Sequence, residues 1–147
     1  TECQGAVGNC QLDKLDMLNN LRIEHGRYLN EGLKGIKGIT PVYEDPNCKH
    51  IYHLYTVCVE EKELGASRDD FLRVLYKEEG VQGILHYQPT YHFTSLKNLG
   101  YAQDICPIAE DFFYRRELNT PHHPRLTKTD LDNIIQGVKN AAEKVRK

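Results

Sequence analysis

Two histidines and two tyrosines crowd the segment from residue 86 to residue 92, on either side of a proline. His86 and Tyr87 precede Pro89, and Tyr91 and His92 follow it. An imidazole titrates near neutral pH and can act as a general acid or base, while tyrosine hydroxyls can donate hydrogen bonds to phosphate or sugar oxygens. The cluster therefore indicates either a functional site or a group of side chains that satisfy backbone groups where a strand ends.

No other pattern completes a catalytic centre. The chain has no G-x-S-x-G sequence, and the glycines between Gly32 and Gly38 do not lead into the G-K-S/T of a phosphate loop. The cysteines form no C-x-x-C pair, which favours reduced thiols, and they lie at positions 3, 10, 48, 58 and 106. We therefore assign no catalytic residue.

Histidine and carboxylate side chains are numerous enough for a metal site, but their spacing does not match one. His86 and His92 are separated by the proline turn, and the chain has no H-x-x-x-H pair. His122 and His123 come just before Pro124, in a segment where histidines are often exposed. We predict no metal ligands, although three carboxylates follow the cluster at Asp104, Glu110 and Asp111.

Charge and hydropathy argue against two classes of partner. The 147 residues carry a formal net charge of −2 without blocks of one sign, and the longest basic pair is Arg115-Arg116. Nucleic-acid surfaces need clustered Lys and Arg, so we expect no nucleic-acid partner. No apolar run is long enough to cross a bilayer and no signal pattern is present, so we expect a soluble cytoplasmic protein without a membrane partner.

The elements that must position the cluster begin with one long amphipathic helix. Leucines recur near helical spacing from Thr1 to about Leu33. We then expect a short strand over residues 40–44 and a central strand over Ile51–Val59, which is rich in β-branched and aromatic residues. The pattern Ser67-Arg-Asp-Asp predicts the start of a second helix that ends before Gly80.

The cluster itself is expected to follow a buried strand over residues 82–87, in the same sheet as Ile51–Val59. Beyond His92 we expect a helical turn at 94–99, a helix at 107–116 and an irregular segment at 118–126. Thr127-Lys-Thr-Asp then opens a final amphipathic helix. The predicted class is α+β, or α/β-like, with a small mixed or antiparallel sheet of about three strands flanked by helices.

The order of these motifs resembles the DegT/DnrJ/StrS family of pyridoxal-phosphate-dependent sugar aminotransferases, and the resemblance covers essentially the whole chain. The segments that carry it are, in chain order, Thr1-Glu-x-Gln-Gly-Ala-Val-Gly, Arg22 and Tyr28, Ile51-Tyr-His-Leu-Tyr, Arg68-Asp69, Gly83-Ile84, His86-Tyr-Gln-Pro, Ala109-Glu110, Asn119-Thr-Pro and Pro124-Arg-Leu-Thr.

The resemblance implies the C-terminal part of a fold-type I aminotransferase. Residues 1–147 would form its small domain, with 1–33 as the helix that connects to a large cofactor-binding domain absent from this chain. The complete enzyme would be a homodimer that uses pyridoxal 5'-phosphate to transfer an amino group from glutamate or glutamine to a nucleotide-linked keto sugar. The lysine that holds this cofactor would lie in the large domain, so we expect the isolated chain to be inactive and to bind no cofactor covalently.

The resemblance also assigns a role to the cluster. His86 and Tyr87 match the family's His-Tyr position at the margin of the site, where they would contact the phosphate of substrate or cofactor, and we extend this role to Tyr91 and His92. A second hypothesis stays open, in which the chain is a non-catalytic binding or regulatory module with the same small-domain fold. The coding sequence upstream of Thr1 distinguishes the two.

Overall fold

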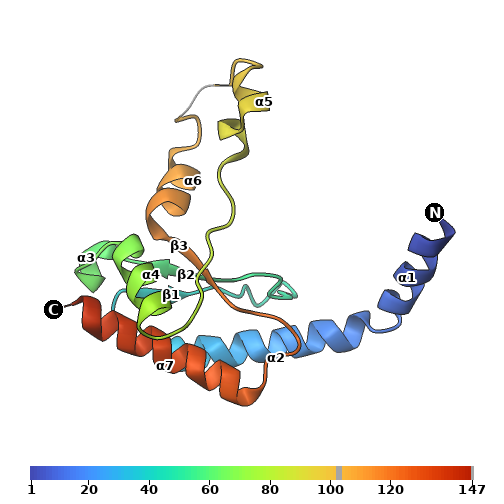
Figure 1. Cartoon of the computed structure of the whole chain (residues 1–147), viewed down its shortest axis with the longest axis horizontal. Coiled ribbons are helices and arrows are strands. Elements are labelled where there is room, and N and C mark those ends of the chain that lie inside the picture. Colours follow the sequence, from blue (N-terminus) through green and yellow to red (C-terminus); the bar gives the residue numbers. More distant parts are fainter. Residues whose placement is uncertain (102–103, 147) are drawn as a thin grey trace.

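The computed structural model describes residues 1–101 and 104–146, and these form helices packed on a small sheet (Figure 1). Its strands are β1 (Ile39–Pro41), β2 (Tyr55–Val59) and β3 (Glu117–Thr120). Its α-helices are α1 (Glu2–Leu12), α2 (Leu15–Leu33), α3 (Glu61–Leu64), α4 (Arg68–Lys77), α5 (Thr94–Lys97), α6 (Pro107–Asp111) and α7 (Lys128–Val145). A 3-10 turn, η1 (Thr90–His92), and a π-helical turn, η2 (Phe112–Arg116), complete the described elements.

The sheet is antiparallel, with β2 between β1 and β3. Val57 of β2 pairs with Pro41 on one side and with Leu118 on the other. Pro41 has no N–H to donate, which a strand at the edge of a sheet tolerates. Side chains alternate along β2, so Tyr55, Val57 and Val59 are buried in the core, while Thr56 and Cys58 face the other side.

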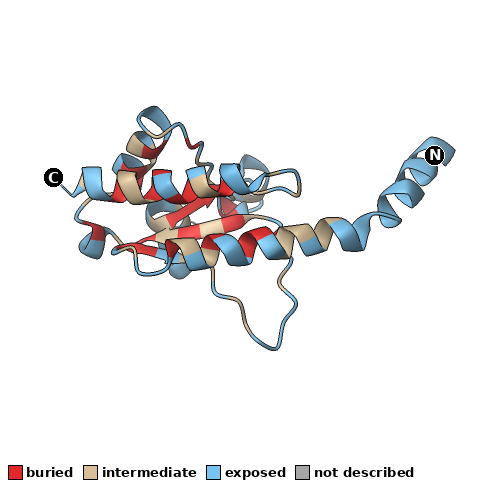
Figure 2. Cartoon of the chain, turned by 90° about the horizontal axis from the view of Figure 1, so that it is seen from below, coloured by how far each residue is buried: buried red, intermediate tan, exposed pale blue. Residues whose placement is uncertain are grey.

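The core lies between the sheet and three helices. Leu29 and Leu33 of α2, Phe71 and Leu75 of α4 and the apolar stripe of α7 pack with the buried residues of β2. Figure 1 shows α2 and α7 beneath the sheet, and Figure 2, seen from below, shows the two helices side by side with buried stretches on both. The class predicted from the sequence, α+β with a small mixed or antiparallel sheet of about three strands flanked by helices, is confirmed, and the sheet is antiparallel.

Caps set the starts of α4 and α7 where the sequence predicted them. The Ser67 hydroxyl accepts a hydrogen bond from the Asp70 N–H. Thr127 and Asp130 form a reciprocal capping box at the start of α7. None of the helices in the described part of the chain combines the length and apolar character needed to span a bilayer.

The single helix expected over residues 1–33 is in fact two helices. The chain turns at Asp13 and Lys14, where the Lys14 N–H donates to the carbonyl of Gln11 rather than to the residue four positions back. All residues of α1 are exposed, and α1 projects away from the rest of the chain (Figures 1 and 2). Because none of its side chains packs in the core, tertiary contacts do not hold α1 in line with α2.

All three predicted strands are also corrected. Residues 82–87 form no strand, because only Ile84 pairs with the sheet, through a single bridge to Asn119. The third strand is β3, within a segment expected to be irregular, so the predicted parallel crossover does not exist. The predicted strands at 40–44 and 51–59 are shorter, since β1 ends at Pro41 and β2 begins at Tyr55 after Tyr52 adopts a left-handed backbone with φ of 49°.

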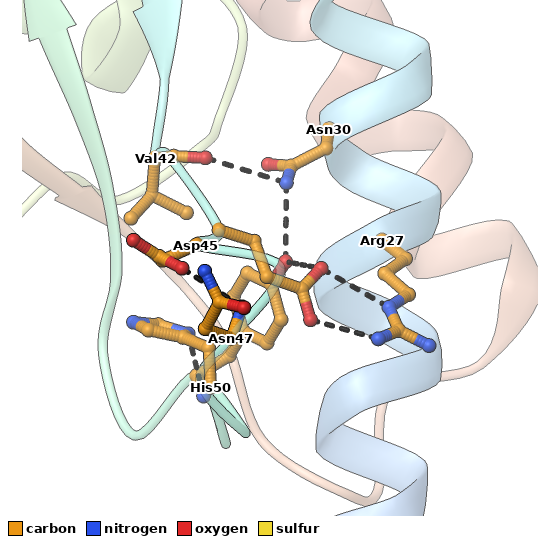
Figure 3. Close-up of polar contacts among 8 residues, drawn as sticks. Arg27, Asn30, Val42, Asp45, Asn47 and His50 are labelled. Carbon is orange, nitrogen blue, oxygen red and sulfur yellow. Dashed lines mark hydrogen bonds and ion pairs between the residues drawn. The ribbon is translucent and has the colours of Figure 1, made fainter.

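A polar network fastens α2 to the loop between β1 and β2 (Figure 3). Arg27 donates two hydrogen bonds to the Glu44 carboxylate, and the Tyr52 hydroxyl donates to the same carboxylate at 3.0 Å. Asn30 donates to the Tyr52 hydroxyl and accepts from the Tyr55 hydroxyl at 2.7 Å. This network positions the start of β2, which borders the candidate site.

Between α4 and β3 the chain leaves the core as an arm, here defined as residues 86–101 and 104–116. The arm carries α5 and α6 and rises from the side of the sheet away from α2 and α7 (Figure 1). All four residues of the sequence cluster lie on it.

Candidate functional site

The base of the arm is hydrogen-bonded to β3. Ile84 and Asn119 exchange backbone hydrogen bonds of 2.8 and 2.9 Å, and the His86 N–H donates to Oε1 of Glu117 at 2.9 Å. The His86 ring is partly buried, whereas Tyr87 is 69% exposed with its ring centroid 4.6 Å from that of His86. The loop backbone is therefore fixed, while the Tyr87 side chain is open to a ligand.

Glu117 is a fully buried carboxyl beneath this loop. Its Oε1 also accepts a hydrogen bond from the side-chain amide of Asn119, whose Oδ1 in turn accepts from the Thr56 hydroxyl at 2.6 Å. Oε2 has no hydrogen-bond partner among the described residues. Burial, which disfavours the charged form, raises the pKa of Glu117.

Arg68, the first residue of α4, joins the start of β3 to the end of the arm. Its buried guanidinium donates to the carbonyls of Phe113, Tyr114 and Glu117 at 2.8–3.0 Å and to the carboxylate of Asp69 at 2.6 Å. A planar guanidinium can serve several acceptors at once. The match of Arg68 to the family pattern thus corresponds to a structural role at the π-helical turn.

Tyr91 and His92 lie in a separate cluster within the arm. The Tyr91 hydroxyl donates to Oε1 of Glu110 at 2.6 Å, and Nδ1 of His92 lies 2.7 Å from the Tyr114 hydroxyl. Nε2 of His92 is 3.5 Å from Glu110, close enough for an ion pair when the ring is protonated but not aligned for a hydrogen bond. Burial, with the bond to Glu110, raises the pKa of Tyr91 to about 12.

The structure therefore divides the four predicted site residues into two pairs. Tyr91 and His92 are buried and bonded within the arm, whereas His86 and Tyr87 lie at its base. Tyr114 joins the two pairs. Its hydroxyl contacts His92 and also accepts a hydrogen bond of 3.5 Å from the side chain of Gln88, the residue after Tyr87. The arm cluster thus stiffens the segment that carries the His86-Tyr87 loop.

A pocket of about 200 Å³ opens beside the loop, between the start of β2, the end of β3 and residues 82–86. We call it the Thr120 pocket, and it is lined by Leu54, Tyr55, Gln82, Ile84, His86, Asn119, Thr120, Pro121 and His122. It is the place where the predicted site residue His86 meets groups from distant parts of the chain.

His122 is not the exposed loop histidine expected from the sequence. Its ring is partly buried, with Nε2 3.2 Å from the carbonyl oxygen of Arg22. Burial lowers the pKa of His122 to about 4, with a further contribution from the nearby Arg22 cation. The ring is therefore neutral at physiological pH.

The sequence interpretation missed the site residues contributed by β3 and the segment that follows it. Glu117, Asn119 and Thr120 lie on a short strand with only one aliphatic residue, and no β-rich pattern marks it. The one pattern in the sequence that could have pointed to these residues was the Asn119-Thr120-Pro121 motif, which is part of the family resemblance.

Neither a covalently held cofactor nor a metal ion fits the groups that this part of the chain provides. The described lysines are all exposed except Lys139, which is half-buried, so none lies in an enclosed site of the kind a covalently bound pyridoxal phosphate needs. Within residues 1–101 and 104–146, no three His, Cys, Asp or Glu side chains come together as a metal site. The exposed Tyr87 and the partly buried His86 instead suit contact with one side of a ligand.

Solved aminotransferases share this fold of helices packed on a three-stranded antiparallel sheet. The profile of the DegT/DnrJ/EryC1/StrS aminotransferase family matches residues 1–139, and the chain belongs to this family.

Curated relatives and solved structures agree with this assignment. The spore coat polysaccharide biosynthesis protein SpsC of Bacillus subtilis is 32% identical over 142 residues, covering 95% of this chain and 36% of SpsC. The dTDP-3-amino-3,4,6-trideoxy-alpha-D-glucose transaminase of Streptomyces venezuelae is 28% identical, with 98% and 36% coverage. PseC of Helicobacter pylori, an aminotransferase involved in the biosynthesis of pseudoaminic acid, superposes with a TM-score of 0.81 at 27% identity, with 96% and 37% coverage.

A further solved relative bears on the cofactor. Spr1654 of Streptococcus pneumoniae, described as a sugar aminotransferase, has structures in PMP, PLP and apo forms. Its PMP form superposes with a TM-score of 0.84 at 31% identity, covering 99% of this chain and 36% of that one. The chain thus spans a little over one third of the length of these relatives.

Proposed function

We propose that this chain is the C-terminal portion of a pyridoxal-phosphate-dependent aminotransferase that acts on nucleotide-linked keto sugars, with glutamate or glutamine as amino donor. The observation that carries the proposal is the family match over residues 1–139 combined with coverage of only about a third of each relative. The names of two relatives, transaminases of a dTDP-linked and a UDP-linked amino sugar, support the substrate class.

In this proposal, residues 1–147 form the small domain and α1 and α2 the connection to a large domain in the rest of the enzyme. The complete enzyme is a cytoplasmic homodimer. Apolar side chains exposed on α1 and early α2 support a partner surface, since they include Val7, Leu12, Leu15 and Met17.

Pyridoxal phosphate, when bound, supplies the electron sink for amino-group transfer, and the protein supplies binding and orientation. We assign to this chain a share of the binding and orientation. His86 and Tyr87 contact the phosphate of substrate or cofactor from the base of the arm, and Glu117 holds their backbone in place through the His86 N–H. Tyr91 and His92 are assigned to the same margin, and their hydrogen bonds to Glu110 and Tyr114 keep the arm in shape. The proton transfers belong to a lysine outside this chain.

The proposal is tested first with phosphate-containing ligands. The 147-residue chain is titrated with UDP and with free pyridoxal phosphate, and amide chemical shifts are followed by NMR. We expect the largest changes at His86 and Tyr87, and we expect His86→Ala and Tyr87→Phe to reduce binding several-fold, because each removes a phosphate donor. Tyr43→Phe is the matched control, since Tyr43 is 76% exposed on the loop between β1 and β2. Changes confined to other surfaces would contradict the assignment.

A second experiment concerns catalysis. With added pyridoxal phosphate, glutamate and a nucleotide-linked keto sugar, we expect the chain alone to show neither the visible absorbance of a lysine-bound cofactor nor amino transfer. A stable absorbance band that disappears when one lysine of the chain is replaced would refute the assignment of the cofactor to another part of the enzyme. Phosphate binding without any catalysis in the complete gene product would favour the binding or regulatory module instead.

A further inference from the structure

The arm has almost no interior of its own. In its described part, only Pro89, Tyr91 and His92 are buried. The arm runs out from the sheet through η1 and α5 and returns through α6 and η2, and no residue of α5, α6 or η2 is buried (Figure 1). A segment with so few buried contacts depends on each of them for its order. The side-chain contacts of Tyr91 and His92 therefore have a large share in holding the outgoing and returning halves together.

The buried ring of His92 lies between the two halves with one nitrogen unsatisfied. Its Nδ1 lies 2.7 Å from the Tyr114 hydroxyl on η2. Its Nε2 is buried, has no hydrogen-bond partner among the described residues, and lies 3.5 Å from Oε1 of Glu110 on α6. Buried polar atoms are normally paired, so the state of this nitrogen needs a physical explanation.

Glu110 presents a negative charge to this nitrogen. Its carboxylate accepts hydrogen bonds from the Tyr91 hydroxyl at 2.6 Å and from the Asp104 N–H at 2.8 Å. The hydrogen bond from Tyr91, with further contributions from Asp104 and His92, holds the pKa of Glu110 below its usual range against the opposing effect of burial. The other titratable groups that the described residues place around His92 and Glu110 are Tyr91, Asp104, Cys106 and Tyr114.

Neither neutral form of the His92 ring satisfies both of its nitrogens. With the proton on Nδ1, the ring donates to Tyr114, and the lone pair of Nε2 faces the Glu110 carboxylate. With the proton on Nε2, the N–H is not aligned for a hydrogen bond with Glu110. The doubly protonated ring donates to Tyr114 and also carries a full positive charge, whose attraction to Glu110 needs no such alignment. The contacts around His92 therefore suit the charged ring.

We propose that His92 is a pH-sensitive latch, which in its protonated form joins the two halves of the arm through Glu110 and Tyr114 and in its neutral form releases Glu110. Imidazole changes its charge between about pH 5 and pH 8, so the latch would respond near neutral pH. The ion pair exists only when the ring is protonated and the arm is closed. Its contribution to the order of the arm is therefore present at low pH and is lost as pH rises.

The latch bears on the loop at the base of the arm. Tyr114, which contacts His92, also accepts a hydrogen bond from Gln88, the residue after Tyr87. Closing the arm therefore restrains the segment that presents the Tyr87 side chain. The inference concerns the order of the arm itself, and it goes beyond the proposed function without depending on it.

The test measures the order of the arm in the 147-residue chain between about pH 5.5 and about pH 8. Pulsed hydrogen exchange is followed by mass spectrometry and expressed as protection factors, which remove the intrinsic pH dependence of exchange. Nitrogen NMR of the His92 ring reports its protonation at each pH. We expect protection over residues 90–98 to fall several-fold as pH rises, in parallel with loss of the ring proton, while protection in α7 changes much less.

Two variants remove the latch in different ways. Glu110→Gln keeps an acceptor for Tyr91 but removes the charge, and His92→Phe keeps a ring but removes the titrating group, so both should abolish the pH dependence of protection. Asp111→Asn is the matched control, because Asp111 is the next residue on α6 and is exposed, and it should leave the pH dependence unchanged.

Three results would overturn the proposal. They are protection of the arm that stays constant while the His92 ring titrates, a ring that stays neutral over the whole range, and a pH dependence that survives in Glu110→Gln or in His92→Phe. Protection in α7 shows whether each variant is folded, and if one variant is not, the wild-type profile and the other variant decide.

Discussion

At the scale of single residues, the site depends on polar side chains buried between the arm and β3. Glu117 supports the His86 backbone, Asn119 bridges Glu117 to β2, and the hydroxyl of Thr120 is buried without a hydrogen-bond partner among the described residues. Such groups cost stability unless paired, and folded proteins keep unpaired ones mainly at functional sites.

Replacing Glu117 by glutamine should make stability depend differently on pH. The raised pKa of Glu117 means that the folded state holds its proton more tightly than the unfolded state. Its contribution to stability is thus present below the unfolded pKa and is lost as pH rises through the folded pKa. We expect the free energy of unfolding of Glu117→Gln, relative to the wild type, to increase as pH rises above the ordinary pKa of a glutamate, about 4.

Urea denaturation at several pH values measures this difference, with the exposed Glu63→Gln as control. A difference that stays constant or falls as pH rises would show that the Glu117 carboxyl is not destabilised by burial in the folded state.

At the scale of elements, one arginine and one glycine stabilise the packing of the helices and strands around the site. Arg68 joins α4 to the π-helical turn and β3, and Gly26 lets Tyr52 pack against α2. Both contacts lie outside the pocket, so changes there should alter stability without removing a ligand contact.

Arg68→Met should cost roughly 3 kcal/mol or more, because it leaves three carbonyl groups without their donor in a buried region. Thermal or urea unfolding measures this loss. The control is Arg73→Met on the same helix, whose ion pair with Asp70 is more than half exposed and should be worth less than about 1 kcal/mol. Equal effects of the two changes would refute the structural role of Arg68.

Gly26→Ala should destabilise the fold by roughly 1–3 kcal/mol, although alanine favours helices. A Cβ at this position would lie within 2.7 Å of the Tyr52 ring, and a rigid aromatic ring cannot yield by a small rotation. Gly8→Ala is the matched control in α1, where a Cβ meets no atom within 4 Å, and it should be neutral or stabilising by up to about 1 kcal/mol. A neutral Gly26→Ala would mean that Tyr52 packs less closely than described.

The helices and strands differ in how well local sequence patterns predict them. Helices α4 and α7 were predictable because their caps and apolar stripes are local. The break at Asp13 and Lys14 was not, since both residues are compatible with a helix and only the absence of core contacts along α1 allows the turn. β3 was missed because its polar residues are stabilised by tertiary partners, and the aliphatic residues near 84 looked like a strand but make a single bridge.

At the scale of the whole molecule, the described chain is a core with two projections. The arm carries apolar side chains far from the core, such as Ile108 at 86% exposure, and α1 and early α2 expose four more. Surfaces of this kind are typical of contacts with another domain or subunit. They fit a chain that covers about a third of its relatives' length.

The isolated chain should therefore self-associate through α1 and early α2. We expect sedimentation velocity to show concentration-dependent dimers or larger species, and the double change Leu12→Glu with Leu15→Glu to shift them towards the monomer, because charged side chains oppose burial of this face. Tyr43→Glu, on a distant exposed loop, is the control. A strictly monomeric wild type at high concentration would argue that this face needs a different partner.

The assignment as one part of a larger enzyme is tested most directly by determining the reading frame upstream of the codon for Thr1. We expect the frame to continue without a start codon into a domain long enough to supply the remaining two thirds of the relatives' length and to contain the cofactor-binding lysine. A start codon immediately before Thr1 would contradict this assignment and would favour a stand-alone module.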